Sequence, residues 1–410
     1  MSGILFLAHR VPFPPDRGDK IRSHHVLKAL AELAPVHVGC FAESVADRVA
    51  ELDLAEVATT WCMPPRSKPL MVAGFEAIVR GEPVSLTAFR HRLLAEWVAH
   101  TLERYEIDTI YVFSGQMGQY VPADWKGRVV VDLVDVDSAK FEAYAREKPL
   151  PMRWIDAREA KLLRRVEARL AARAEQTLLV SHAEAALFVS RLPAGTAARV
   201  AVLGNGIDTK TFDPSQIAPH PALSSRGPHF VFTGQMDYKP NVDAALRAIE
   251  RIMPEIRAAH PMAQFHAVGR APTPELLARD GANGARVWGE VPDVRPFLAG
   301  ADVVLAPLTI ARGVQNKVLE AMAMARPVLV AAAAANGLPG KDGLHLAVAD
   351  SDTALAQRAL DLLAQPEVAR EMGEAARRLV LETTSWPAML ASLPGLIGRP
   401  FRPKACLDAA

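Results

Sequence analysis

Cysteine is scarce in this chain, which has only Cys40, Cys62 and Cys406 among 410 residues. Their number is odd, they lie far apart and none belongs to a C-x-x-C pair, so the pattern predicts neither a disulfide framework nor a zinc site. Long apolar runs are missing too. No window approaches the roughly 20 apolar residues of a membrane-spanning helix, and the first run, Ile4–Leu7, is too short for a signal peptide. We therefore expect a cytoplasmic protein, soluble or peripherally attached.

The sequence also lacks a charge imbalance and several familiar motifs. Its 47 basic and 46 acidic side chains leave a net charge of +1, which argues against a nucleic acid as the main partner. No G-x-G-x-x-G follows a strand pattern, and neither a P-loop, HExxH nor G-x-S-x-G occurs. The sequence therefore gives no motif-based support for a dinucleotide-binding fold, a P-loop nucleotidase, a zincin or an α/β-hydrolase.

Short apolar runs alternate with helical patterns along the whole chain, which is typical of α/β folds with parallel sheets. At 410 residues the chain is long for one core, so we expect two domains. A proline- and serine-rich segment at 213–228 follows a G-N-G-I-D turn and marks their connection. We place the first domain at 1–208 and the second at 209–384. A C-terminal helix at 385–410, with a tail, is expected to return to the first domain.

Residues 311–330 contain one acidic residue, Glu320, between a glycine loop and a proline that ends a helix. A valine-rich run at 302–307 predicts a buried strand, a loop with Gly313 and Val314 follows, and a helix runs from Asn316 until Pro327 prevents its continuation. The loop of such a βαβ unit lies at the carboxyl end of the sheet, where α/β folds bind ligands. Glu320 could accept hydrogen bonds from ribose hydroxyls while the loop amides face a phosphate. A solvated helix glutamate is the alternative.

Two loops of the first domain hold further candidates. Gly18 lies where the loop after the first strand meets a helix, and Arg22 adds positive charge there, which suits an anion; a proline-rich turn with a flexible glycine is the alternative. Asp135 follows a buried strand pattern at 129–134 and begins the sequence DVDS. It could orient sugar hydroxyls or, less readily, help to hold a metal. Helix capping by this segment is the alternative.

Residues 64–102 mix large apolar side chains with arginines, the pattern of amphipathic helices. Such helices can rest on an anionic membrane surface. More often they pack on a core, with arginine stems lying along apolar surface. We expect core packing, with contact to the cytoplasmic face of the inner membrane as the alternative.

Five segments together show a family resemblance: GDKIR from Gly18, GNGID from Gly204, GQMDYKPN from Gly234, GEVPDV from Gly289 and NKVLEAMAMARPVLV from Asn316. Over nearly the whole chain they resemble the GT4-like glycosyltransferases of the GT-B fold. FPPDRGDKIRS, VDLVDVDS and GVQNKVLEAMA are most similar to bacterial sugar transferases associated with exopolysaccharide loci and the PEP-CTERM/exosortase sorting system.

The resemblance implies two Rossmann-like, doubly wound domains facing a cleft. The second would hold a nucleotide-sugar donor, and the first a glycan or polyprenyl-linked sugar acceptor. Transfer would retain the anomeric configuration, with no essential metal and no cofactor beyond the nucleotide sugar as co-substrate. Glu320 matches the ribose-binding glutamate, Lys239 the lysine that neutralises the diphosphate, and Gly18 the glycine loop near the phosphate. Val291 matches the segment beside the nucleobase, and Gly269 and Arg270 belong to the same donor side.

Two departures from the family pattern bear on the chemistry. Arg312 stands where the family has its first donor-site glutamate, and Gln235 stands where an arginine is usual. Our hypothesis is that Arg312 replaces the lost charge, which donor binding by an Arg312→Ala variant would test. Lys239, Arg312 and the loop amides are then expected to stabilise the departing nucleoside diphosphate, and Asp135 to orient the acceptor. The alternatives are a GT-B nucleotide-sugar epimerase and a non-catalytic nucleotide-sugar-binding component of a polysaccharide assembly complex.

Overall fold

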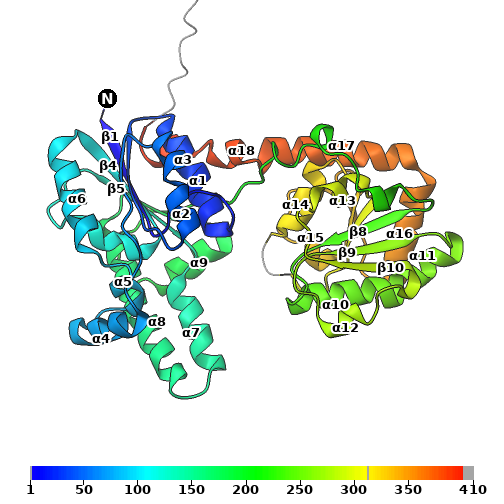
Figure 1. Ribbon diagram of the computed structural model, residues 1–410, viewed down its shortest axis with the longest axis horizontal. Coiled ribbons are helices and arrows are strands. Elements are labelled where there is room, and N and C mark those ends of the chain that lie inside the picture. Colours follow the sequence, from blue (N-terminus) through cyan, green and yellow to red (C-terminus); the bar gives the residue numbers. More distant parts are fainter. Residues whose placement is uncertain (1, 312–313, 400–410) are drawn as a thin grey trace, which may run out of the picture. The chain divides into compact units, whose positions relative to one another are not determined.

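The computed structural model describes residues 2–311 and 314–399, and the chain divides into two compact units. The first comprises Met1–Asn205 and the segment that begins at Met389, and the second is Gly206–Ala388. The sequence-based divisions stand at 208/209 and 384/385. Each unit has its own parallel sheet with helices on both faces (Figure 1).

The sheet of the first unit has seven strands in the order β3-β2-β1-β4-β5-β6-β7. Its strands are β1 (Gly3–Ala8), β2 (Val36–Gly39), β3 (Thr60–Cys62), β4 (Ile107–Phe113), β5 (Arg128–Val134), β6 (Gln176–Leu179) and β7 (Val200–Val202). Its helices are α1 (Gly18–Ala31), α2 (Val45–Val49), α3 (Glu51–Ala55), α4 (Leu70–Arg80), α5 (Val84–Thr87), α6 (Arg92–Arg104), η1 (Gly115–Tyr120), α7 (Asp137–Glu147), α8 (Met152–Arg173), α9 (His182–Arg191) and α19 (Leu393–Leu396). Helix α18 (Trp386–Leu390) spans the boundary between the units.

The sheet of the second unit has six strands in the order β10-β9-β8-β11-β12-β13. Its strands are β8 (His229–Thr233), β9 (Gln264–Val268), β10 (Ala285–Gly289), β11 (Val303–Ala306), β12 (Val328–Val330) and β13 (Ala347–Val348). Its helices are η2 (Pro214–Gln216), η3 (Pro221–Ser224), α10 (Lys239–Arg247), the π-helical turn η4 (Ala248–Ile252), α11 (Met253–Ala259), α12 (Pro274–Leu277), η5 (Ala282–Gly284), α13 (Arg295–Gly300), α14 (Asn316–Ala323), α15 (Ala332–Ala335), α16 (Asp352–Ala364) and α17 (Pro366–Thr383).

Both sheets are doubly wound. In each, the chain starts at a central strand, adds strands outward in one direction, and then returns to build the other half. The strand order therefore reverses between β1 and β4 and again between β8 and β11. A ligand crevice forms at the carboxyl ends of strands where the order reverses. The predicted α/β class with two Rossmann-like sheets is confirmed.

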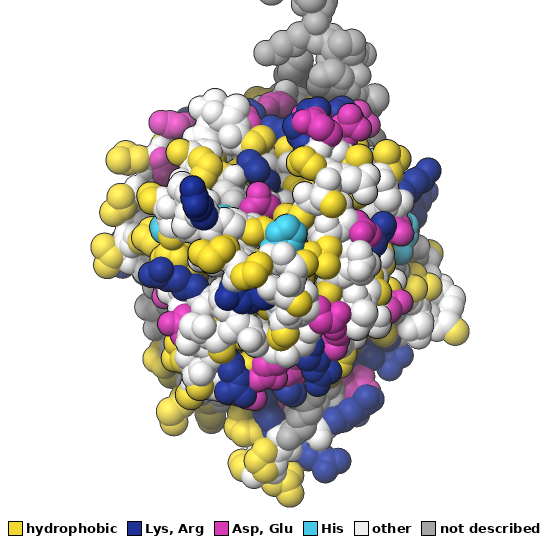
Figure 2. Space-filling view, turned by 90° about the vertical axis from the view of Figure 1, so that its right-hand side faces the viewer, with side chains coloured by type: hydrophobic (Ala, Val, Ile, Leu, Met, Phe, Trp, Pro, Cys, Tyr) yellow, Lys and Arg dark blue, Asp and Glu magenta, His cyan; other side chains and the backbone are white. Residues whose placement is uncertain are grey.

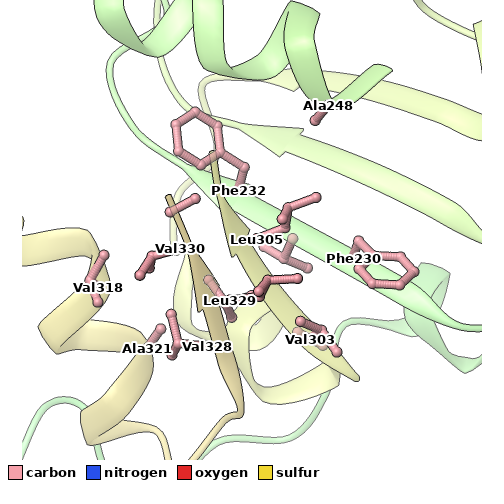
Figure 3. Packing of buried hydrophobic residues seen from close by; sticks show 14 of the residues in the cluster. Phe230, Phe232, Ala248, Val303, Leu305, Val318, Ala321, Val328, Leu329 and Val330 are labelled. Carbon is pink, nitrogen blue, oxygen red and sulfur yellow. The ribbon is translucent and has the colours of Figure 1, made fainter. Parts of the chain in front are cut away.

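The core of the second unit fixes the orientation of α14. Val318 and Ala321 are fully buried and lie beside β12, near Val328 and Val330 (Figure 3). Residues three apart on a helix share a face, so Lys317 and Glu320 occupy a neighbouring stripe of the same helix. The apolar packing of α14 thus leaves a charged stripe available for a site.

Helices α4 and α6 of the amphipathic segment differ in their packing. Helix α6 buries Leu94 and Val98, as predicted for a helix on a core. In α4 only Ala73 and Ala77 are buried, and its large apolar side chains are exposed. Core packing therefore accounts for α6, whereas α4 contributes only the small side chain of Ala73 to the core cluster and leaves its large apolar side chains exposed.

The surface shows no separation of charge on the face seen in Figure 2, where basic, acidic and hydrophobic side chains are interspersed. This distribution agrees with the near-neutral composition of the chain. Within residues 2–311 and 314–399, every helix is too short or too polar to cross a membrane.

Candidate functional site

A cavity of about 380 Å³ lies in the second unit at the carboxyl ends of β8 and β9, beside α14. Cavities of roughly 300–1,000 Å³ are typical of small-molecule sites. Helix α14 follows β11, so the cavity occupies the place where the strand order reverses. It is lined by Thr233, Gly234, Gln235, Val268, Gly269, Arg270, Glu290, Val291, Val294, Lys317 and Glu320.

Two glycines allow the ends of β8 and β9 to approach one another beneath the cavity. A Cβ on Gly269 would lie 1.6 Å from the carbonyl oxygen of Gly234, so no other residue fits there without moving the backbone. Gly234 donates its amide to the oxygen of Val268 at 3.0 Å, and Gly269 donates to Gly289 at 2.9 Å. A Cβ on Gly234 would come within 3.2 Å of the Lys317 ammonium. The floor of the cavity is therefore backbone, which a phosphate can approach closely.

Lys317 and Glu320 place a cation and a carboxylate together in this cavity. The Lys317 ammonium donates a hydrogen bond to the side-chain oxygen of Asn241 and lies 5.0 Å from the ring centroid of Phe232. Burial lowers the pKa of Lys317 to about 8, although the charge of Glu320 acts in the opposite direction. Burial also raises the pKa of Glu320, opposed by the charge of Lys317. Both groups are poorly hydrated, so each gains from a polar ligand of complementary charge.

A short hydrogen-bond chain connects the rest of the rim to this pair. Arg270 donates to the side-chain oxygen of Gln235 at 3.0 Å, and Asn241 donates to the backbone oxygen of Gln235 at 2.9 Å. Asn241 is buried and also accepts from Lys317. The hydrogen-bond partners of these two cations are thus neutral amides.

The structure gathers four of the sequence-predicted residues, Gly269, Arg270, Val291 and Glu320, around one cavity. Val314 is exposed and lies outside the set of described residues that line it. The predicted residues Arg312 and Gly313 lie outside the described residues.

Lys239 is not the cation that the structure brings to the cavity. It is the first residue of α10, its side chain is 84% exposed, and its ammonium lies 3.0 Å from Asp243. Helix α10 buries Asn241 and Val242 instead, so its first residue faces solvent. The sequence contained a signal for Lys317, because that residue precedes Glu320 by three positions and so shares its helical face.

Arg22 differs from the prediction that its charge would face an anion. Its guanidinium is 1% exposed and donates to both carboxylate oxygens of Asp132, at 3.0 and 3.1 Å. It also donates to the backbone oxygen of Gly204 at 3.3 Å and to Asn205 at 3.0 Å. Tyr111 donates to the same aspartate at 2.9 Å. Arg22 therefore holds together distant parts of the first unit instead of pointing to a ligand.

Gly18 and Asp135 remain at the carboxyl edge of the first sheet. Gly18 begins α1 and is exposed, with open space where a Cβ would stand. Asp135 follows β5 and lies 2.8 Å from the Lys140 ammonium.

At the ends of β4 and β5, Ser114 and Val134 have φ angles of 75° and 67°, a left-handed backbone that is costly for a residue with a Cβ. Such strain clusters at functional sites.

His9 was missed by the sequence-based prediction. It follows β1, where the strand order of the first sheet reverses, and its Nε2 lies 3.1 Å from Asp19. Its ring is stacked on Phe113 with a centroid distance of 6.0 Å. The only signal in the sequence was its position directly after the first strand.

Among the described residues, no group of three or more His, Cys, Asp or Glu side chains is arranged to hold a metal ion.

Known proteins resemble this chain in both sequence and fold. Residues 227–365, which include the whole cavity, match the family model described as Glycosyl transferases group 1. Alpha-maltose-1-phosphate synthase of Mycolicibacterium smegmatis is 29% identical over 217 residues, 46% of this chain and 54% of that protein. The chain therefore spans about half the length of this curated relative.

Solved structures show the same fold over almost the full length. Sucrose-phosphate synthase from Thermosynechococcus elongatus has a TM-score of 0.59 at 17% identity, covering 97% of this chain and 98% of that one. Anabaena Alr3699/HepE in complex with UDP and glucose has a TM-score of 0.59 at 15% identity, covering 96% and 99%. Residues 227–365 are thus similar to group 1 glycosyltransferases, and the chain as a whole has the GT-B fold of these solved structures.

Proposed function

We propose that this protein transfers a sugar from a nucleoside diphosphate sugar to a glycan or polyprenyl-linked acceptor, with retention of configuration and without a required metal. The observation that carries the proposal is the Lys317–Glu320 pair above a glycine floor, at the strand-order reversal of a group 1 domain. A place in exopolysaccharide biosynthesis, in association with PEP-CTERM/exosortase sorting, is supported by the sequence resemblance alone.

The roles in donor binding follow from the chemistry of the cavity. The diphosphate is the most highly charged part of the donor, and its charge grows as the sugar leaves, so preorganised cations contribute most to catalysis. Lys317 lies over the backbone floor and is the first candidate, with Arg270 second. Glu320 accepts hydrogen bonds from the ribose hydroxyls. Val291 and Val294 provide an apolar wall for the nucleobase.

On the acceptor side we keep Asp135 and Gly18 as the proposed groups. Both lie at the carboxyl edge of their sheet, as the donor residues do in theirs. The partly exposed carboxylate of Asp135 is able to orient a sugar hydroxyl.

A nucleotide screen followed by a transfer assay tests the proposal. The HepE structure holds UDP and glucose, so UDP-glucose is the first donor to try, with GDP- and ADP-sugars beside it. We expect one of these donors to raise the unfolding temperature and then to support transfer onto a polyprenyl-diphosphate-linked sugar, with the anomeric configuration retained.

The alternative functions give distinct results in the same experiment. Interconversion of the nucleotide sugar without an acceptor would show an epimerase. Stabilisation by the donor without transfer to any acceptor would show a binding component. Absence of stabilisation by all three nucleotides would overturn the donor site.

Substitution of Glu320 by glutamine tests the ribose contact. A hydrogen bond to a charged group contributes about 1.5–3 kcal/mol, so we expect wild-type protein to bind UDP roughly 10- to 100-fold more tightly than 2′-deoxy-UDP. The Glu320→Gln variant should lose most of this preference, as measured by calorimetric titration. Glu382→Gln, on the exposed end of α17, is the matched control and should keep it. An unchanged preference in Glu320→Gln would remove the ribose assignment.

Donor affinity should depend on pH through Lys317. In the free protein its pKa is lowered to about 8, so the ammonium is present below this pH and lost above it. A bound diphosphate favours the charged form, and binding above pH 8 must therefore take up a proton. We expect the Kd for UDP to rise by up to about tenfold per pH unit above 8. A Lys317→Arg variant stays charged, so its Kd for UDP should not change with pH above 8. If the Kd of the variant rose with pH as steeply as that of wild type, the pH dependence would belong to another group.

A further inference from the structure

Helix α4 has its hydrophobic pattern turned outward. The side chains that it buries are those of Ala73 and Ala77, both fully buried, and Thr87 donates a 2.8 Å hydrogen bond to the backbone oxygen of Ala73. Met71 is 88% exposed and Phe75 is 71% exposed. The exposed apolar side chains of α4 are Leu70, Met71, Val72, Phe75, Ile78 and Val79. Contiguous exposed apolar surface of this kind marks an interaction site.

The start of α8 extends this surface. Leu150, Met152, Trp154 and Ile155 are exposed, with Trp154 at 72%. Arg158, one turn further along α8, donates to the backbone oxygen of Ala77 in α4 at 2.9 Å. Trp154 and Ile155 precede Arg158 by four and three positions and so lie on the same face of α8. We call the exposed apolar residues of the two helices the α4–α8 surface; Figure 1 shows both helices at one end of the first unit.

Basic side chains flank the α4–α8 surface. Between residues 64 and 92 the chain has five basic and two acidic side chains. Glu76, on α4 itself, lies 2.8 Å from Lys68, 3.1 Å from Arg80 and 3.3 Å from Arg90. Arg90 also pairs with Glu82, Arg66 with Glu43 and Arg92 with Glu96, so the five cations face four carboxylates and exceed them by one. Arg153 adds an exposed cation beside Trp154. An apolar helix face with aromatic side chains and a cationic border is complementary to the interface of an anionic bilayer.

We infer that the α4–α8 surface docks the protein onto an anionic lipid membrane, with α4 lying parallel to the bilayer plane. At 11 residues, α4 is about 16 Å long, which suits a helix lying on the interface. A second copy of the chain fits this surface less well. In a two-fold dimer the basic borders of the two copies would face and repel one another. The inference concerns the first unit only and is independent of the proposed donor site.

Vesicle co-sedimentation of the full chain tests this inference. We expect binding to phosphatidylcholine vesicles that contain phosphatidylglycerol, much weaker binding to phosphatidylcholine alone, and weakening by salt. Substituting Met71 and Phe75 together by serine should lower the partition coefficient by about tenfold or more, because two large apolar side chains no longer leave water. Substituting Val45 and Leu52 by serine is the matched control, since both are exposed apolar residues of the same unit; it should bind as wild type.

Two further measurements keep the outcomes separate. Unfolding temperature and UDP binding should be unchanged in the Met71/Phe75 variant, which shows that the fold and the donor site are intact. Equal vesicle binding by the Met71/Phe75 variant and wild type would overturn the inference, as would failure of wild type to bind the anionic vesicles. A wild-type dimer in light scattering that this variant abolishes would assign the surface to a second copy instead.

Discussion

Substitution of Lys317 by methionine is expected to weaken UDP binding by about 2–5 kcal/mol, the range measured when one partner of a buried charge pair is truncated. Methionine keeps the length and apolar contacts of the lysine stem, and removes the ammonium that lies over the backbone floor of the cavity. Uridine, which has no phosphate, should bind the variant about as well as wild type. Calorimetric titration with both ligands measures the difference.

Lys239→Met is the matched control for this prediction. The Lys239 ammonium is exposed and paired with Asp243 outside the cavity, so its removal should change UDP affinity by less than about 1 kcal/mol. The opposite result, with affinity lost in Lys239→Met and kept in Lys317→Met, would restore the assignment made from the family pattern.

Substitution of Asp132 by asparagine is expected to lower the free energy of unfolding of the first unit by about 3–5 kcal/mol, because it leaves the Arg22 charge buried without a counter-ion. The pair is well placed for a large effect. Asp132 is fully buried, accepts two hydrogen bonds from Arg22 and accepts another from Tyr111. Calorimetric unfolding should show the transition of the first unit moving to lower temperature.

Asp135→Asn serves as the control for the Asp132 substitution, since this nearby carboxylate is partly exposed and paired with a surface lysine. It should change stability by no more than about 0.5 kcal/mol. UDP affinity should be unchanged in both variants, because the proposed donor cavity belongs to the second unit. If Asp132→Asn were as stable as wild type, the buried pair would not hold the first unit together.

The strands could be predicted because their signals are local. The strand patterns predicted at 302–307 and 129–134 are short runs dominated by apolar residues, and the structure has β11 and β5 there. The two-residue strand β13 was missed, since a pair of apolar residues has no periodicity to detect. Proline similarly marked where a helix ends, since the helix expected from Asn316 to before Pro327 is α14, which ends at Ala323.

Charged residues were predicted less well, because a sequence shows that a side chain is charged but not where it points. Lys239 lies on the outer side of α10 and Arg22 on the inner side of α1, although both were expected at ligands. Lys317 was overlooked in favour of the position that matches the family pattern. The helical spacing between Lys317 and Glu320 was available in the sequence and is a local signal of the same kind as those that identified the strands.

By itself the sequence determined the alternation of strands and helices and the candidates Gly269 and Glu320, because these depend on neighbours within one turn or one loop. Only the tertiary structure decided which cation accompanies Glu320 and which arginine is structural. Arg22 meets Asp132 across 110 residues of chain, and such partners are set by the packing of the whole sheet. The same holds for α4: its amphipathic pattern is local, but which of its faces is covered depends on the elements that pack against it.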